Sequence, residues 1–149
     1  TYTMMKKLSI FFLLMVLVLT AQAQKPNNVN KGNLAVQGYD VVAYFQNSVQ
    51  EGDAALASEH QGVRYLFSSA ENQMLFDQNP AKYAPQYGGW CAYAMGKSGD
   101  FVKVNPEAYK VLEGKLYLFY KTKKVNTLML WNEDEQLLKQ KADKHWQSK

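Results

Sequence analysis

The chain has 149 residues, of which 47% are hydrophobic, 20% charged and 13% aromatic, and its formal net charge at pH 7 is +4. This balance excludes an intrinsically disordered chain, and the length favours one domain because domains commonly span about 100–200 residues. The single cysteine, Cys91, excludes a disulfide framework and a zinc site built from several cysteines.

Residues 1–23 are predicted to comprise a few upstream residues and a cleaved signal peptide. An uncharged apolar run at 8–19 follows two lysines, and Ala21 and Ala23 provide the small residues of a cleavage site before Gln24. This run is shorter than the roughly 20 residues of a membrane-spanning helix. We therefore expect an exported protein, periplasmic or secreted, that keeps no stable membrane anchor after cleavage.

The charge of the mature chain argues against a nucleic-acid partner. Cleavage removes two lysines and no acidic residue, which leaves 15 basic and 13 acidic residues, a net charge of +2. The only tight basic cluster is Lys121, Lys123 and Lys124, and no nucleic-acid-binding motif accompanies it. We expect this cluster to be a solvated surface.

The folded domain is predicted to extend over 34–149, after a polar and flexible leader at 24–33 that lacks hydrophobic periodicity. Asp40 precedes a short apolar segment at 41–45. This segment is compatible with a helical turn that the Asp40 carboxylate caps, and its β-branched residues are also compatible with a strand.

A first β-hairpin is predicted at 54–67, around the two-residue turn Gln61–Gly62. After the turn, Val63, Tyr65 and Phe67 occupy alternate positions. Because successive side chains of a strand point to opposite faces, this alternation is typical of a strand with one buried face.

Two short helices are predicted next. The first begins at Ser68, because Ser68 and Glu71 have the spacing of a capping box, and it ends before Asn79–Pro80. The glycine pair Gly88–Gly89 then interrupts the chain, and the second helix is expected to open at 90–92.

The remaining chain completes the prediction of an α+β fold. A strand is expected at 101–104, and a second hairpin at 109–120 around Glu113–Gly114. Asn132 is the expected cap of a C-terminal helix whose buried edge recurs every four residues from 138 to 146. Two hairpins forming an antiparallel sheet, with separate short and C-terminal helices, predict a small single domain of the α+β class.

Several stretches of the chain resemble the YHS domain family. Two of them resemble the family in general, namely FSSAENQMLF at 67–76 and NPAKY at 79–83. Three others are similar to its exported bacterial branch with a single cysteine, namely GYDVVAYF at 38–45, YGGWCAYA at 87–94 and GKLYL at 114–118. The resemblance covers about 34–146, nearly the whole mature chain.

The resemblance implies metal binding, with copper as the metal ion, because YHS domains occur in copper-transporting pumps. Metal-binding relatives place cysteines at positions that here hold Ser68 and Asn72, so these soft-metal thiolates are absent. The exported branch instead has its cysteine at the position of Cys91, where some members carry selenocysteine. The resemblance therefore implies a chemical role for Cys91.

The predicted metal site consists of Cys91, His60 and Met95. A helix that opens at Cys91 would offer free amide hydrogens to a thiolate, which is the form that binds metal. Met95 lies four residues further along and so shares a helix side with Cys91, and Cys with Met or His suits Cu(I). Met74 and His145 are further candidates, although methionines more often fill a core.

Two alternatives stay open. In the first, Cys91 is the catalytic nucleophile of a thiol-dependent oxidoreductase that attacks a peroxide or disulfide and needs an external thiol to resolve the product. In the second, the protein is a small-ligand-binding module with a structural cysteine. Its expected pocket is formed by Tyr87, Gly88, Gly89, Trp90 and Tyr93. The sequence favours binding over catalysis and leaves enzymatic activity open.

Overall fold

The computed structural model describes Tyr2 and residues 23–149. The predicted signal peptide therefore lies outside the described residues, apart from Tyr2 and Ala23. In the part of the chain that is described, no helix is both long and apolar enough to span a membrane.

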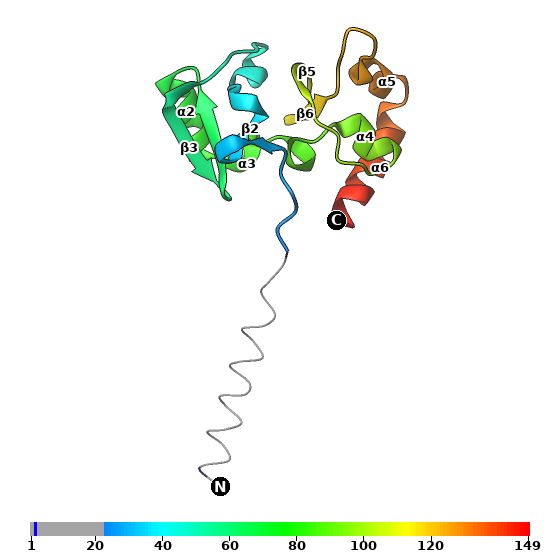
Figure 1. Ribbon diagram of the computed structural model, residues 1–149, viewed down its shortest axis with the longest axis horizontal. Coiled ribbons are helices and arrows are strands. Elements are labelled where there is room, and N and C mark those ends of the chain that lie inside the picture. Colours follow the sequence, from blue (N-terminus) through cyan, green and yellow to red (C-terminus); the bar gives the residue numbers. More distant parts are fainter. Residues whose placement is uncertain (1, 3–22) are drawn as a thin grey trace.

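Four strands form the first sheet, in the spatial order β1-β2-β4-β3. They are β1 (Val29–Asn30), β2 (Leu34–Ala35), β3 (Asp53–His60) and β4 (Val63–Phe67). The antiparallel pair β3 and β4 is the first predicted hairpin, which is confirmed. Two helices, α2 (Ala70–Gln78) and α3 (Pro80–Tyr83), follow it in sequence and lie in the same half of the view in Figure 1.

The second predicted hairpin is also confirmed, as β5 (Asn105–Leu112) and β6 (Lys115–Phe119). It forms a separate two-stranded sheet. In the first sheet, β2 pairs in parallel with the edge of β4 that β3 does not use. No strand forms at 101–104, and β5 instead begins at Asn105. Its register shifts between Asn105 and Tyr109 around Pro106, which lacks the amide hydrogen for a regular ladder.

Three helices gather beside the second hairpin: α4 (Ala92–Lys97), α5 (Thr127–Glu133) and α6 (Glu135–Gln147) (Figure 1). Four short 3-10 helices complete the described structure. They are η1 (Lys31–Asn33), η2 (Val36–Gly38), η3 (Ala43–Gln46) and η4 (Gln86–Gly89). Two sheets with segregated helices confirm the α+β class.

Two predicted helix caps are wrong by one or two positions. Ser69, not Ser68, caps α2, because its Oγ accepts a hydrogen bond of 3.1 Å from the backbone N of Asn72. Ser68 instead donates its hydroxyl to the buried carboxylate of Asp40. Asn132 lies inside α5, and α6 begins after Asp134.

The segment 24–33 differs from the flexible leader expected from its composition. It contains β1 and η1, and β1 pairs antiparallel with β2. The backbone N of Asn28 donates to Gly88 O at 2.8 Å, and Trp90 Nε1 donates to Pro26 O at 2.9 Å. This segment therefore belongs to the folded domain.

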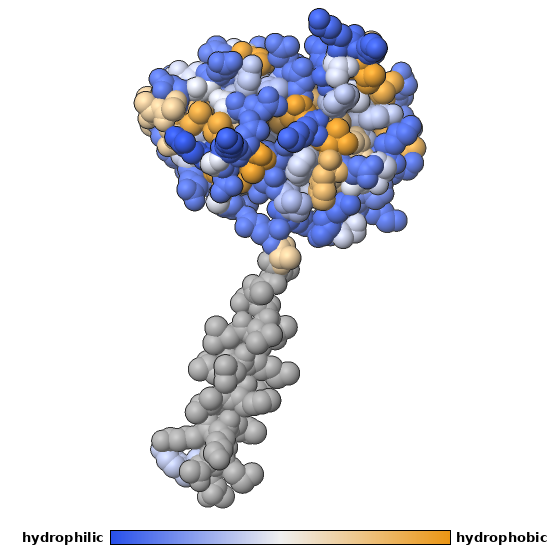
Figure 2. Space-filling model, in the orientation of Figure 1, coloured by the Kyte–Doolittle hydropathy of each residue, from blue (hydrophilic) through white to orange (hydrophobic). Residues whose placement is uncertain are grey.

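Strand β6 lies between the two clusters of the hydrophobic core. Leu116 and Leu118 belong to the cluster built around the first hairpin, whereas Tyr117 and Phe119 belong to the cluster beneath α5 and α6. Alternating side chains of one strand thus reach both clusters, and all four residues are buried. Hydrophobic residues on the face seen in Figure 2 are interspersed with hydrophilic ones.

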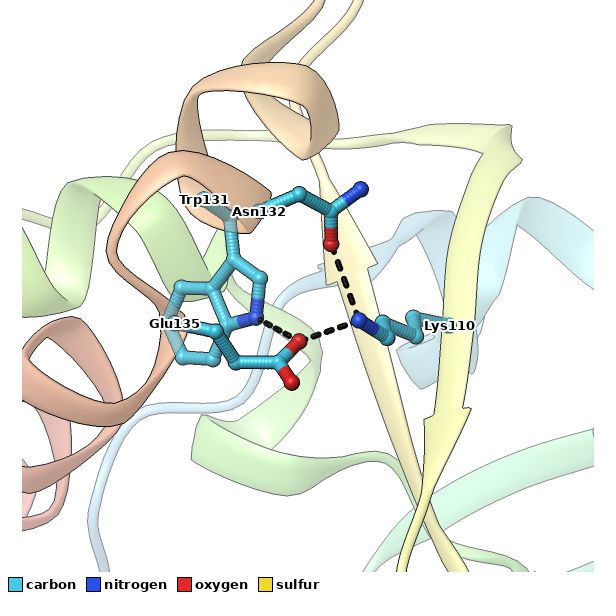
Figure 3. A network of polar contacts seen from close by, with 4 residues as sticks. All are labelled: Lys110, Trp131, Asn132 and Glu135. Atoms are coloured by element: carbon cyan, nitrogen blue, oxygen red, sulfur yellow. Dashed lines mark hydrogen bonds and ion pairs between the residues drawn. The ribbon is translucent and has the colours of Figure 1, made fainter.

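A polar network fastens α5 and α6 to β5 (Figure 3). Lys110 Nζ donates to Asn132 Oδ1 at 2.9 Å and forms an ion pair with Glu135. Trp131 Nε1 donates to the same carboxylate at 2.9 Å. Because Trp131 is fully buried, this bond satisfies a donor that would otherwise be left without a partner at the edge of the core.

Candidate functional site

Cys91 lies between η4 and α4 and is fully buried. Its backbone N donates to Val102 O at 2.9 Å, and its carbonyl accepts from Met95 N at 3.0 Å. Its side chain makes no capping hydrogen bond to α4. The expected stabilisation of a thiolate by the first amides of this helix is therefore absent.

The sulfur of Cys91 contacts two other elements instead. Sγ accepts from the backbone N of Tyr120 at 3.3 Å and lies 3.4 Å from Thr127 Oγ1. The Thr127 hydroxyl has one hydrogen, which it donates to Tyr120 O at 2.7 Å. The contacts of Sγ with Tyr120 N and Thr127 Oγ1 connect the start of α4 with the end of β6 and the start of α5.

The three residues of the predicted metal site have different surroundings in this structure. Cys91 and Met95 are both fully buried, but their side chains belong to different core clusters. The ring of His60 meets Phe76 edge-on at 6.3 Å. Within 23–149 no group of three or more His, Cys, Asp or Glu residues is placed to hold a metal ion.

The two further metal candidates also lie elsewhere. Met74 is 54% exposed on α2. His145 Nδ1 forms a hydrogen bond of 2.6 Å with Met95 O, so its imidazole satisfies a carbonyl near the end of α4.

The glycine pair makes room for the N-terminal segment. Gly88 and Gly89 have φ values of +61° and +80°, which side chains disfavour. A Cβ on Gly88 would lie 3.0 Å from the Pro26 carbonyl, the Asn27 side chain and the Trp146 ring. The pair therefore permits a close crossing of two chain segments.

A cavity of about 280 Å³ lies beside this crossing. Its walls come from residues 27–29, η2, the β3–β4 turn, the stretch from α3 to η4, and Trp146 of α6. Of the five residues expected to form a pocket, Tyr87 and Gly88 line this cavity. Gly89, Trp90 and Tyr93 are not among its lining residues. Cys91 does not line it either, whereas His60 does.

Two polar side chains of the first hairpin meet at this cavity. His60 pairs with Val63, and Tyr65 lies two residues further along β4, so the three side chains share one face of the hairpin. The rings of His60 and Tyr65 both contact Phe76, at 6.3 and 4.6 Å. Each residue could be named from the sequence alone. The register that the turn at 61–62 imposes on the hairpin was the signal that places both side chains on the same face.

The hydroxyl of Tyr65 has no hydrogen-bond partner among the described residues, although the residue is only 6% exposed. No buried side-chain oxygen or nitrogen in 23–149 lacks a partner. The hydroxyl oxygen therefore keeps solvent contact, and Tyr65 lines the cavity. Burial raises the pKa of Tyr65 to about 12, so at neutral pH the group is a phenol that can donate or accept.

Backbone strain is concentrated at the same cavity. Val36 and Tyr87, which both line it, have φ values of +47° and +55°. For a β-branched or bulky residue this conformation is an outlier, and such outliers cluster at functional sites. The Tyr87 hydroxyl donates to Asp143 Oδ1 at 2.8 Å, and burial followed by this bond raises the pKa of Tyr87.

No family model, characterised protein or solved structure matches the chain.

Proposed function

We propose that the protein is an exported small-ligand-binding module of the YHS type, in which Cys91 is a structural residue. The observation that carries this proposal is the cavity at which two polar side chains converge, His60 and Tyr65, whose polar atoms have no hydrogen-bond partner among the described residues. Concave sites with a few convergent polar groups are the usual form of small-molecule sites. The stretches of sequence that resemble the exported YHS branch support the family and the location.

The geometry favours this function over the two that use Cys91 directly. A metal ligand or a nucleophile has to be reached by its metal or substrate, and Cys91 is fully buried with its sulfur bonded to Tyr120 and Thr127. The metal-binding and redox roles stay predictions from the sequence.

A fragment screen by protein-observed NMR tests the proposal. Binders are expected to shift the ring signals of His60 and Tyr65 saturably and to raise the melting temperature, because a ligand that binds only the folded state stabilises it. The variant Cys91→Ser is the control and should keep this binding. A Cys91→Ser variant that remains folded but loses binding, or a screen without shifts at either ring, would contradict the proposal.

A further inference from the structure

The cavity beside His60 and Tyr65 is lined without a single Asp, Glu, Lys or Arg residue. Asp143 is not among the lining residues, and it accepts from the Tyr87 hydroxyl and from Lys139 Nζ at 3.0 Å. Lys25 Nζ lies against the lining ring of Trp146, 5.1 Å from its centre, and donates to Trp146 O. None of the lining residues themselves would supply a countercharge to a charged ligand, which would lose its hydration at a cost. The lining therefore favours an uncharged ligand.

The polar groups at the cavity include donors and acceptors of hydrogen bonds. Four amide side chains line it, those of Asn27, Asn28, Gln61 and Gln86. Each amide offers two donors and one acceptor oxygen, and the Tyr65 hydroxyl and the His60 imidazole can each do both. Asn28 already uses its amide nitrogen on Gly89 O at 3.0 Å. Ligand hydroxyl groups, which donate and accept at once, match such a mixed lining.

The apolar part of the lining favours a puckered ring over a flat one. The rings of Tyr87 and Trp146, which both line the cavity, have centroids 6.3 Å apart and are inclined at 70°. Because the two rings are not parallel, they cannot enclose a flat heterocycle between two stacking faces. The volume of about 280 Å³ lies just below the usual range of about 300–1,000 Å³ for ligand pockets, so it suits a single ring.

Building on the proposed function, we infer that the cavity binds an uncharged, hydroxyl-rich ring of monosaccharide size, with His60 and Tyr65 as specificity-determining residues. The ligand hydroxyls bond to the Tyr65 hydroxyl, the His60 imidazole and the amides of the rim. The aliphatic face of the sugar packs on the aromatic walls.

The test is NMR titration of the isotope-labelled protein with glucose, galactose and N-acetylglucosamine, beside glucuronate, glucosamine and uracil. At least one neutral sugar is expected to shift the His60 and Tyr65 signals saturably. Its charged counterpart should bind at least about tenfold more weakly, because a charge is not compensated in the cavity. Uracil is expected not to bind.

Matched tyrosine variants locate the site. Tyr65→Phe should weaken the sugar about tenfold, the effect of one hydrogen bond. Tyr83→Phe should leave the affinity unchanged, since Tyr83 is also 6% exposed but does not line the cavity. Any one of four results overturns the inference. They are equal affinity in Tyr65→Phe, tighter binding of a charged sugar, binding of uracil alone, and no binding of any of the six compounds. The proposed function is tested separately: it fails if the wider fragment screen gives no shifts at His60 and Tyr65, or if a folded Cys91→Ser variant loses binding.

Discussion

At the scale of single residues, Cys91 is a small buried side chain with two weak polar contacts. A buried free cysteine packs much like a small hydrophobic residue, and its S–H group is a weak donor. In this protein the sulfur lies 3.4 Å from the Thr127 hydroxyl and accepts a hydrogen bond from the amide of Tyr120, and these contacts hold three chain segments together. Such a thiol reacts with solvent reagents only when these segments separate.

We therefore predict that labelling of Cys91 by a disulfide reagent follows unfolding. Without denaturant the thiol should remain unmodified, and in increasing urea the labelled fraction should follow the loss of circular dichroism. Release of the reagent's coloured thiol provides the measurement, with the fully unfolded chain as the positive control. Rapid stoichiometric labelling of the native protein would contradict a structural role and would favour the redox alternative.

At the scale of elements, Asp40 joins η3 to the start of α2. Its carboxylate is fully buried and accepts five hydrogen bonds. Two come from the backbone of Val42 and Ala43, and the others from Ser68 and Asn72. The carboxylate thus replaces lost hydration with fixed donors, as a buried charge requires.

Replacement of this carboxylate by an amide is predicted to be costly. In Asp40→Asn, the amide nitrogen would face groups that also donate, so buried donors lose their acceptor. We expect the free energy of unfolding to fall by about 2–3 kcal/mol, measured by urea denaturation. Asp53→Asn is the control, with an expected change within about 0.5 kcal/mol, because Asp53 is exposed and an amide oxygen can still accept from Ala55. Equal losses in both variants would contradict the role of Asp40.

Elements that depend on local pattern could be predicted from the sequence, and those that depend on distant partners could not. Both hairpins are where alternation and two-residue turns place them. The cap of α2 was misplaced because Ser68 bonds to Asp40, which lies 28 residues earlier. Strand β1 was missed because its stability comes from β2 and from contacts with Gly88, not from hydrophobic periodicity.

At the scale of the whole molecule, the two ends of the described domain meet at the cavity. Lys25 Nζ donates to Trp146 O, and the ammonium group lies 5.1 Å from the centre of the Trp146 ring. Figure 1 shows the N-terminal segment leaving the domain below the sheets, between the first hairpin and α6. The sequence indicated Tyr87 and Gly88 as pocket residues. Local sequence patterns could not predict contacts between residues more than 60 positions apart, such as that of Pro26 with Trp90.

Gly88 provides a test of this long-range closure, because Gly114 is a matched control. Both residues have positive φ, +61° and +71°, so alanine is strained at either position. A Cβ at Gly114 meets nothing within 4 Å, whereas at Gly88 it meets the N-terminal segment and Trp146. Gly88→Ala should therefore lower the free energy of unfolding by about 1–3 kcal/mol more than Gly114→Ala. The amide of Asn28, which donates to Gly88 O, should also exchange its hydrogen faster in Gly88→Ala alone. Equal unfolding energies with unchanged exchange would mean that the segment is not held against Gly88, and the cavity would then lack its N-terminal wall.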